Sequence, residues 1–219
     1  MEAAALSYRH PRTGEWAHDV RDPLGEARRV YAEPSLAARP PRAGECLRLL
    51  DIGFGRGLNT ACALAAAATA RPGGRIRALG LEPHPERLTP WPPLPVAIAA
   101  VAPWWGLEPG AWSLGAAVCG EVRAAPAPEG LAEDTAFDWI FLDLHSPGRH
   151  PEDWRPDLLA AVTAAAAPGA VLTSYCVARA LRDGLADLGW RVARERPAAG
   201  RDRLLAVLAI PGQPVLDEA

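Results

Sequence analysis

The chain has 219 residues, 49% of them hydrophobic, which is typical of one globular domain with its own core. Its formal net charge is −3, and every basic residue is an arginine, which argues against a protein that coats nucleic acid non-specifically. The four cysteines include no C-x-x-C pair, and no stretch resembles a signal peptide or a membrane span. We therefore expect a soluble cytoplasmic domain with reduced cysteines.

Residues 46–210 alternate between strand and helix patterns, whereas residues 1–45 show weak periodicity with one helix predicted near 24–38. Such alternation predicts βαβ units and a mostly parallel sheet, to which the last two strands add an antiparallel hairpin. We expect one α/β domain over 46–210, with 1–45 as an N-terminal extension packed on the core and 211–219 as a flexible tail. The expected strands are 46–53, 75–82, 115–121, 137–144, 170–176, 190–195 and 203–210, and the expected helices are 57–70, 151–167 and 177–189.

Residues 89–113 interrupt this pattern with a stretch rich in proline and tryptophan. Proline prevents regular helix and central strand in such a segment. We favour a packed loop that covers an edge of the sheet. The alternative is an aromatic platform on which a nucleobase stacks.

The segment LDIGFGRGLN follows the first predicted strand and carries three glycines at alternate positions. The spacing Asp51-x-Gly53-x-Gly55-x-Gly57 does not fit the G-x-G-x-x-G pattern of dinucleotide folds. An acid followed by G-x-G-x-G is typical of the first motif of S-adenosylmethionine-dependent methyltransferases. The glycines let the backbone approach a cofactor, and Asp51 can orient the loop or accept from the cofactor's ammonium group. Asn59 opens the next helix, where it can satisfy polar groups.

Acidic residues also stand at the expected ends of later strands, at Glu82, Glu121 and Asp143. Ligands of open α/β sheets bind at the carboxyl ends of the strands, so these acids and Asp51 should converge on one crevice. A carboxylate at Glu82 can accept both hydroxyls of a ribose. Each acid alone is explained equally well as a solvated turn residue, and their joint placement favours the crevice.

Three segments of the chain resemble signature motifs of one family. The segment DIGFGRGLN is similar to E-x-GFGTGLNF, and GRDRLLAVL is similar to an ending GRKRE-x-L. The segment FDWIFLDLHSPGRHPEDW resembles the block D-x-x-FLDGFAP-x-x-NP-x-x-W, with matches at Asp143, Pro147, Pro151 and Trp154. The family is the methyltransferase domain of the bifunctional tRNA 5-methylaminomethyl-2-thiouridine biosynthesis protein. The resemblance covers most of residues 15–208.

The resemblance implies a Rossmann-like methyltransferase fold that uses S-adenosylmethionine. It implies methyl transfer to the aminomethyl nitrogen of a modified wobble uridine, with the anticodon region of tRNA as substrate. The family's oxidase domain has no counterpart in this sequence, so a separate oxidase would supply the aminomethyl precursor. By position, glycines would line the cofactor and three acids would hold its ribose, its adenine and its reacting end: Gly53, Gly55, Gly57, Glu82, Glu121 and Asp143.

Methyl transfer to an amine requires a neutral nitrogen in line with the sulfonium carbon, so a nearby base would help. Asp143 is the first candidate for holding and deprotonating the amine. His145 is the second, although a turn histidine without a role explains it equally well. The candidate substrate contacts are Pro147, Arg149 and Trp154. Arg149 could pair with tRNA phosphates, and Trp154 could stack on the acceptor base or simply anchor the core.

Four residues depart from the family's pattern: Arg56 replaces Thr, Leu144 replaces Gly, His145 replaces Phe and His150 replaces Asn. His145 and His150 border the expected acceptor site, so they leave the acceptor more open than the cofactor. One alternative is therefore a small-molecule N- or O-methyltransferase or an aminopropyltransferase-like enzyme of the same fold. Another is a non-catalytic protein that binds cofactor or RNA.

The histidines and a cluster of arginines are two further groups of residues that could bind ligands. The histidines at positions 10, 18, 84, 145 and 150 show no H-x-x-x-H or Cys/His ligand spacing, so we expect no metal site. An arginine cluster near the last predicted hairpin is explained most simply as a solvated face, with tRNA phosphates as the alternative partners. The cluster consists of Arg191, Arg194, Arg196, Arg201 and Arg203.

Overall fold

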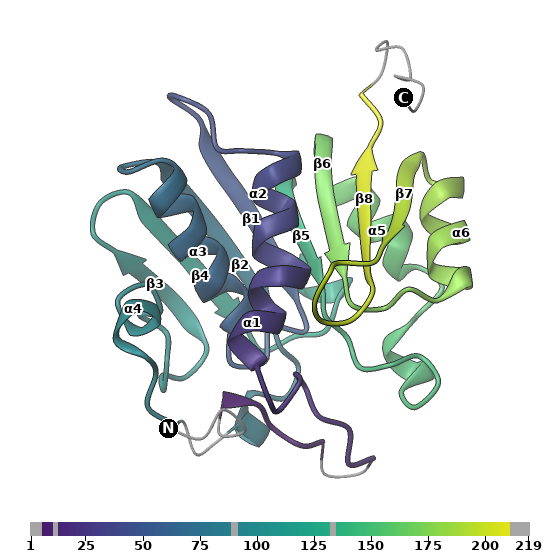
Figure 1. Ribbon diagram of the computed structural model, residues 1–219, viewed down its shortest axis with the longest axis horizontal. Coiled ribbons are helices and arrows are strands. Elements are labelled where there is room, and N and C mark those ends of the chain that lie inside the picture. The colour runs from purple at the N-terminus through teal and green to yellow at the C-terminus, as the bar shows by residue number, and fades with distance from the viewer. Residues whose placement is uncertain (1–5, 11–12, 89–91, 132–134, 211–219) are drawn as a thin grey trace.

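The computed structural model describes residues 6–10, 13–88, 92–131 and 135–210. These residues build an eight-stranded sheet with the strand order β3-β4-β2-β1-β5-β6-β8-β7 (Figure 1). The strands are β1 (Cys46–Ile52), β2 (Arg75–Leu81), β3 (Gly110–Leu114), β4 (Val118–Arg123), β5 (Phe137–Leu142), β6 (Ala166–Ser174), β7 (Trp190–Glu195) and β8 (Arg203–Leu208).

The five strands from β4 to β6 in this order run parallel, and β8 runs antiparallel to both β6 and β7. This arrangement confirms the expected α/β fold, a mostly parallel sheet with an antiparallel C-terminal hairpin. The antiparallel edge strand β3 was not predicted. It lies at the end of the Pro/Trp-rich segment, where no proline follows Pro109, so the backbone is free to pair along an edge.

Helices cover both faces of the sheet (Figure 1). None of those in the described residues is long and apolar enough to cross a bilayer. The helices and helical turns are α1 (Pro23–Ala27), η2 (Arg28–Ala32), α2 (Glu33–Ala38), α3 (Leu58–Ala70), η3 (Pro85–Leu88), α4 (Val96–Ala99), η4 (Glu129–Leu131), η5 (Pro151–Asp153), α5 (Leu158–Ala165) and α6 (Arg179–Asp187).

The core has two layers, one on each face of the sheet. Leu47 and Leu49 of β1 pack in the cluster formed with α1, η2 and α3, whereas Leu50 and Ile52 pack in the cluster formed with α5 and α6. Side chains alternate between the faces of a strand, so Asp51 belongs to the first face. The strand is therefore apolar on both sides, as expected for a central parallel strand.

The helix predicted over 151–167 is shorter in the structure. Residues Pro151–Asp153 form a single 3₁₀ turn, and α5 begins only at Leu158. Pro156 disfavours helical geometry in the residue before it, which separates the two elements. At the other end, the chain enters β6 at Ala166. The helix predicted near 24–38 is present as α1, η2 and α2, which begin at Pro23 behind the N-cap Asp22.

The Pro/Trp-rich segment packs on the sheet where it is described. Trp104 is 4% exposed and lies against Phe54 and Trp112, with ring centroids 5.7 and 4.6 Å away. Its indole N–H donates to the backbone oxygen of Arg56. These contacts favour the packed loop over the aromatic platform. Trp91 lies outside the described residues.

Candidate active site

A cavity of about 400 Å³ opens beyond the carboxyl ends of β1, β2 and β5. Ligands of open α/β sheets bind at this edge, and the volume lies within the ordinary range for ligand pockets, roughly 300–1,000 Å³. Part of the lining comes from these strand ends. Another part, called the N-terminal wall below, comes from residues 8–18. The lining includes Tyr8, His10, Trp16, His18, Gly53, Gly55, Arg56, Glu82, His84, Asp143, His145, His150, Asp153, Arg155 and Tyr175.

The glycine loop after β1 depends on its glycines for both shape and space. Gly53 has a φ of +80°, and a Cβ there would lie 2.4 Å from the backbone oxygen of Asp143. Gly55 has a φ of +53°, and a Cβ there would come no closer than 3.9 Å to the backbone oxygen of Gly53. Since Gly55 also lines the cavity, it leaves bare backbone beside the space for a ligand.

Glu82 follows β2 and is held by the glycine loop. Its side chain is 6% exposed. One carboxylate oxygen accepts from the N–H of Gly55 at 2.9 Å, and the other accepts from the N–H of His84 at 2.8 Å. Burial raises the pKa of Glu82, and these two hydrogen bonds oppose that rise. Each oxygen keeps acceptor capacity, so the fixed carboxylate can receive a pair of hydroxyl groups.

Asp143 follows β5, and its carboxylate is anchored by two donors. The hydroxyl of Tyr31 donates to one oxygen at 2.5 Å, and the side-chain amide of Asn59 donates to the other at 2.7 Å. Burial raises the pKa of Asp143, while the nearby His18 acts in the opposite direction. The cavity therefore holds a positioned carboxylate with an increased affinity for a proton.

Known proteins resemble this chain in sequence. It is 37% identical to the tRNA 5-methylaminomethyl-2-thiouridine biosynthesis bifunctional protein MnmC of Caulobacter vibrioides, over 70% of this chain and 28% of that protein. It is 29% identical to the protein of the same name from an Azoarcus species, over 88% of this chain and 32% of that protein. The chain thus spans less than a third of the length of these curated relatives.

The fold has a solved counterpart. The crystal structure of MNMC2 from Aquifex aeolicus matches with a TM-score of 0.81 at 25% identity, over 95% of this chain and 69% of that chain. A family model described as S-adenosyl-L-methionine-dependent methyltransferase matches residues 117–209. At 37% identity over 70% of its length, the chain belongs to the family of the Caulobacter vibrioides protein, as a methyltransferase that uses S-adenosylmethionine. The uncovered backbone at Gly55 and the fixed carboxylate of Glu82 fit the cofactor that such enzymes use.

Three residues that were predicted to bind the cofactor do not line the cavity but lie next to residues that do. Asp51 is fully buried, and its carboxylate accepts from the hydroxyl of Thr60 in α3 at 2.7 Å. Burial raises the pKa of Asp51 well above its usual value. Gly57 caps α3 in the left-handed conformation, and Asn59 holds Asp143. These residues shape and support the loop, and none of them lines the cavity.

Glu121 departs from its expected place. Strand β4 continues to Arg123, so Glu121 lies within the strand, and its carboxylate pairs with Arg123 at 2.9 Å. It does not line the cavity, which argues against the expected contact with adenine. The chain instead reaches the cavity further on, at Pro126 and Ala127.

The predicted substrate contacts also lie off the cavity lining. Pro147, Arg149 and Trp154 are not among its lining residues. The indole N–H of Trp154 donates to the backbone oxygen of His145 at 2.7 Å, so Trp154 supports the loop that carries His145. The neighbouring Arg155 does line the cavity, and it pairs with carboxylates.

The N-terminal wall was not predicted from the sequence. Tyr8, His10, Trp16 and His18 all line the cavity of the methyltransferase. Burial lowers the pKa of His18, but the carboxylate of Glu26, 3.7 Å from Nδ1, and the other neighbouring carboxylates outweigh that effect and raise the pKa overall. The segment lacks the periodicity of a helix or strand, so its sequence carried no signal that it would face the strand ends.

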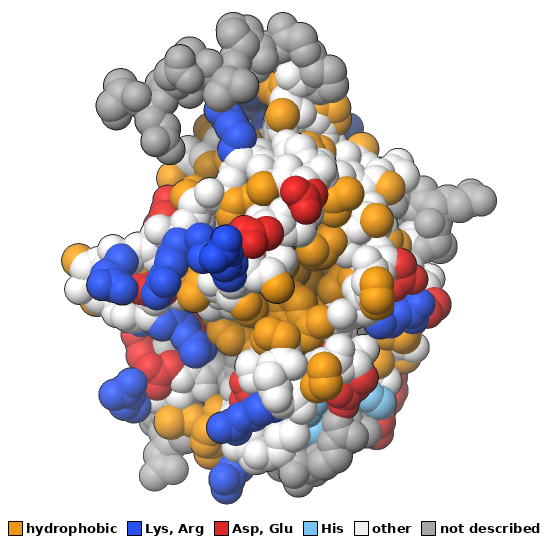
Figure 2. Space-filling view, turned by 90° about the vertical axis from the view of Figure 1, so that its right-hand side faces the viewer, with side chains coloured by type: hydrophobic (Ala, Val, Ile, Leu, Met, Phe, Trp, Pro, Cys, Tyr) orange, Lys and Arg blue, Asp and Glu red, His pale blue; other side chains and the backbone are white. Residues whose placement is uncertain are grey.

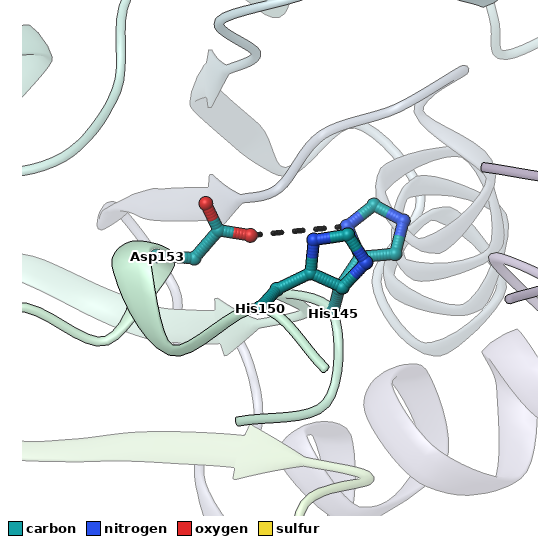
Figure 3. Close-up of side chains that lie close together, drawn as sticks. All are labelled: His145, His150 and Asp153. Carbon is teal, nitrogen blue, oxygen red and sulfur yellow. Dashed lines mark ion pairs between the residues drawn. The ribbon is translucent and has the colours of Figure 1, made fainter. Parts of the chain in front are cut away.

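Three histidines from two distant segments, the N-terminal wall and the loop after β5, meet at the cavity. The ring of His10 lies 4.9 Å from that of His145 and 4.2 Å from that of His150, measured between centroids. His145, His150 and Asp153 also form a group that could hold a metal ion (Figure 3). Their spacing, H-x-x-x-x-H-x-x-D across a loop and one 3₁₀ turn, is not a common ligand motif, so this group could not be predicted from the sequence.

The arginine cluster of the last hairpin is engaged with acids. Figure 2, which faces α6 and β7, shows arginine side chains beside carboxylates and an apolar hollow. Most arginines of the cluster pair with carboxylates, which favours the solvated face over a tRNA contact. The pairs are Arg194 and Arg196 with Asp202, Arg201 with Glu26, and Arg203 with Glu195.

Proposed function

We propose that this methyltransferase methylates the aminomethyl nitrogen of a modified wobble uridine in tRNA. The observation that carries the proposal is the half-buried, doubly anchored carboxylate of Asp143, which lines the cavity close to His18 of the N-terminal wall. The related MnmC proteins are named for biosynthesis of 5-methylaminomethyl-2-thiouridine in tRNA. A cavity with a cofactor side and a carboxylate side suits an amine acceptor.

The cofactor side comprises the glycine loop and Glu82. Bound S-adenosylmethionine would supply an electrophilic methyl group at its sulfonium centre. The bare backbone at Gly55 would admit the cofactor closely, and Glu82 would accept from its ribose hydroxyls. We do not assign the adenine to Glu121, because that side chain points to Arg123.

The acceptor side would hold the amine at Asp143. An alkylammonium must lose a proton before its nitrogen can attack, and that proton would pass to the Asp143 carboxylate. The raised pKa of Asp143 brings it closer to that of a working base. Tyr31 and Asn59 fix the carboxylate, so much of the rate would come from positioning. His145, on the same lining, is the second candidate for the proton.

The substrate proposal requires a preceding reaction. The uridine must already carry a primary aminomethyl group, so a separate oxidase activity must act on the tRNA before this methyltransferase. The curated relatives are named as bifunctional proteins. We propose that tRNA is the macromolecular partner and that the reaction takes place in the cytoplasm.

Transfer of labelled methyl groups from S-adenosylmethionine to bulk tRNA tests the proposal. The tRNA would come from cells that lack the wobble methyltransferase, and fully modified tRNA would serve as the control. We expect label only on the deficient tRNA, in a nucleoside that co-elutes with methylaminomethyl-uridine. No label with a protein that still binds S-adenosylhomocysteine would reject the tRNA acceptor and favour a small-molecule acceptor.

A further inference from the structure

Two histidines and one aspartate that line the cavity are arranged like the ligands of a metal ion. His145, His150 and Asp153 each offer one ligand atom, and these three atoms lie within 4.8 Å of one another (Figure 3). His145 follows β5, and the other two belong to or border the turn η5. All three side chains line the cavity.

Three imidazole rings pack together at this group. His150 is 2% exposed and His10 is 7% exposed, and the rings of both lie against that of His145. Imidazole nitrogens are common ligands of divalent metal ions.

Carboxylates and a hydroxyl surround the two rings and orient them. Nδ1 of His145 lies 3.9 Å from the carboxylate of Asp153. Nε2 of His150 lies 2.8 Å from the hydroxyl of Thr13 and 3.9 Å from the carboxylate of Glu15. Partners of this kind hold a metal-binding histidine in one orientation, and the local negative charge attracts a cation.

We propose that His145, His150 and Asp153 bind a divalent metal ion such as zinc in the lining of the cavity. Two imidazoles and a carboxylate, with a fourth position left open, form a donor set that zinc accepts in open sites. In a tetrahedral zinc site the ligand atoms are roughly 3.3 Å apart, so the three side chains would draw together around the ion. The open position would face the cavity.

The two histidines distinguish this chain from the pattern of the family it resembles. That pattern has Phe where His145 stands and Asn where His150 stands. A metal site would therefore be a property of this chain and would not follow from methyl transfer. It also gives two natural test substitutions, His145→Phe and His150→Asn, which restore the residues of that pattern.

The test is calorimetric titration of Zn²⁺ into chelator-treated, buffer-exchanged protein. We expect one equivalent to bind with a Kd of about 1 µM or tighter, and Co²⁺ to give the visible absorption of a tetrahedral site. His145→Phe and His150→Asn should each weaken Zn²⁺ binding by more than about 100-fold, because loss of a residue that only hydrogen-bonds to a ligand already costs about 10- to 100-fold. No saturable binding by the wild type overturns the proposal.

Two further variants guard against misfolding and unspecific binding. Asp153→Asn removes the carboxylate at a partly exposed position and should weaken Zn²⁺ binding while thermal unfolding stays near that of the wild type. His84→Ala removes another histidine of the cavity lining, which lies beside Glu86 and is not among the proposed ligands, and should leave binding unchanged. Unchanged binding in Asp153→Asn, or equal loss in His84→Ala, would contradict the proposed ligands. These readouts need no methyl transfer, so failure here leaves the proposed function untouched.

Discussion

At the scale of single residues, the candidate site depends on groups that hold one another in place. Glu82 is fixed by two backbone N–H groups, and Asp143 is fixed by Tyr31 and Asn59. Each carboxylate faces the cavity while its neighbours restrict its movement. Substitutions here should therefore separate cofactor binding from the chemical step.

Asp143→Asn tests the proposed base. The amide keeps the shape of the carboxylate but cannot take up a proton, so we expect methyl transfer to fall about 10²- to 10⁴-fold. Affinity for S-adenosylhomocysteine, measured by calorimetry, should change little. Burial raises the pKa of Asp143, so the wild-type rate should fall with decreasing pH already above the usual carboxyl range, and the variant should lack that limb. Wild-type turnover in the variant would reject the assignment.

Gly53→Ala and Gly55→Ala should differ in what they damage. Both place a side chain at positive φ, which costs about 1–2 kcal/mol. Only the Cβ at Gly53 meets backbone, 2.4 Å from the oxygen of Asp143, and such overpacking adds about 1–3 kcal/mol. Denaturant unfolding should show the larger stability loss for Gly53→Ala. Gly55→Ala should instead mainly weaken S-adenosylhomocysteine binding, and equal stability losses would contradict this distinction.

At the scale of elements, the alternation of buried strands and helices was enough to predict the sheet and its C-terminal hairpin. It also located the glycine loop, Glu82 and Asp143 at the ends of β1, β2 and β5. The edge strand β3 and the place of Glu121 could not be predicted, because strand bounds depend on register with neighbours. The N-terminal wall was missed because its contacts are long-range and leave no local periodicity.

Trp16 tests whether the N-terminal wall binds the acceptor. It is 45% exposed and lines the cavity, so truncation should cost little stability. If its ring stacks on the acceptor base, Trp16→Ala should raise KM for tRNA by about tenfold, since base stacking contributes about 1–3 kcal/mol. Leu107→Ala, at a residue 62% exposed and outside the cavity lining, is the matched control. An unchanged KM for Trp16→Ala would remove the wall from the acceptor site.

At the scale of the whole molecule, an acidic residue buried behind the site makes the free energy of unfolding depend on pH. Asp51 is fully buried, and one of its carboxylate oxygens has no hydrogen-bond partner among the residues that the structure describes. Its folded-state pKa lies well above the unfolded value, so the folded state binds the proton more readily. Stability from this group is therefore present at low pH and is lost as the pH rises through the raised pKa.

Asp51→Asn tests this pH dependence. The amide oxygen can still accept from Thr60, and the variant has no charge to bury. Relative to the wild type, we expect a gain of about 1 kcal/mol or more at pH 8 and a smaller gain at pH 5. Denaturant unfolding at the two pH values measures the difference. If the gain in the free energy of unfolding is equal at both pH values, or larger at pH 5, Asp51 is not the source of the pH dependence.

The N-terminal wall has a consequence for synthesis on the ribosome. Glu26, at the base of this segment, pairs with Arg201, and the side chain of Arg203 bonds to the backbone oxygen of Arg29. The N-terminal wall is thus secured by residues that are made about 175 positions later in the chain. A nascent chain could already fold its glycine loop, yet the N-terminal wall would gain this support only after the β7–β8 hairpin has emerged from the ribosome.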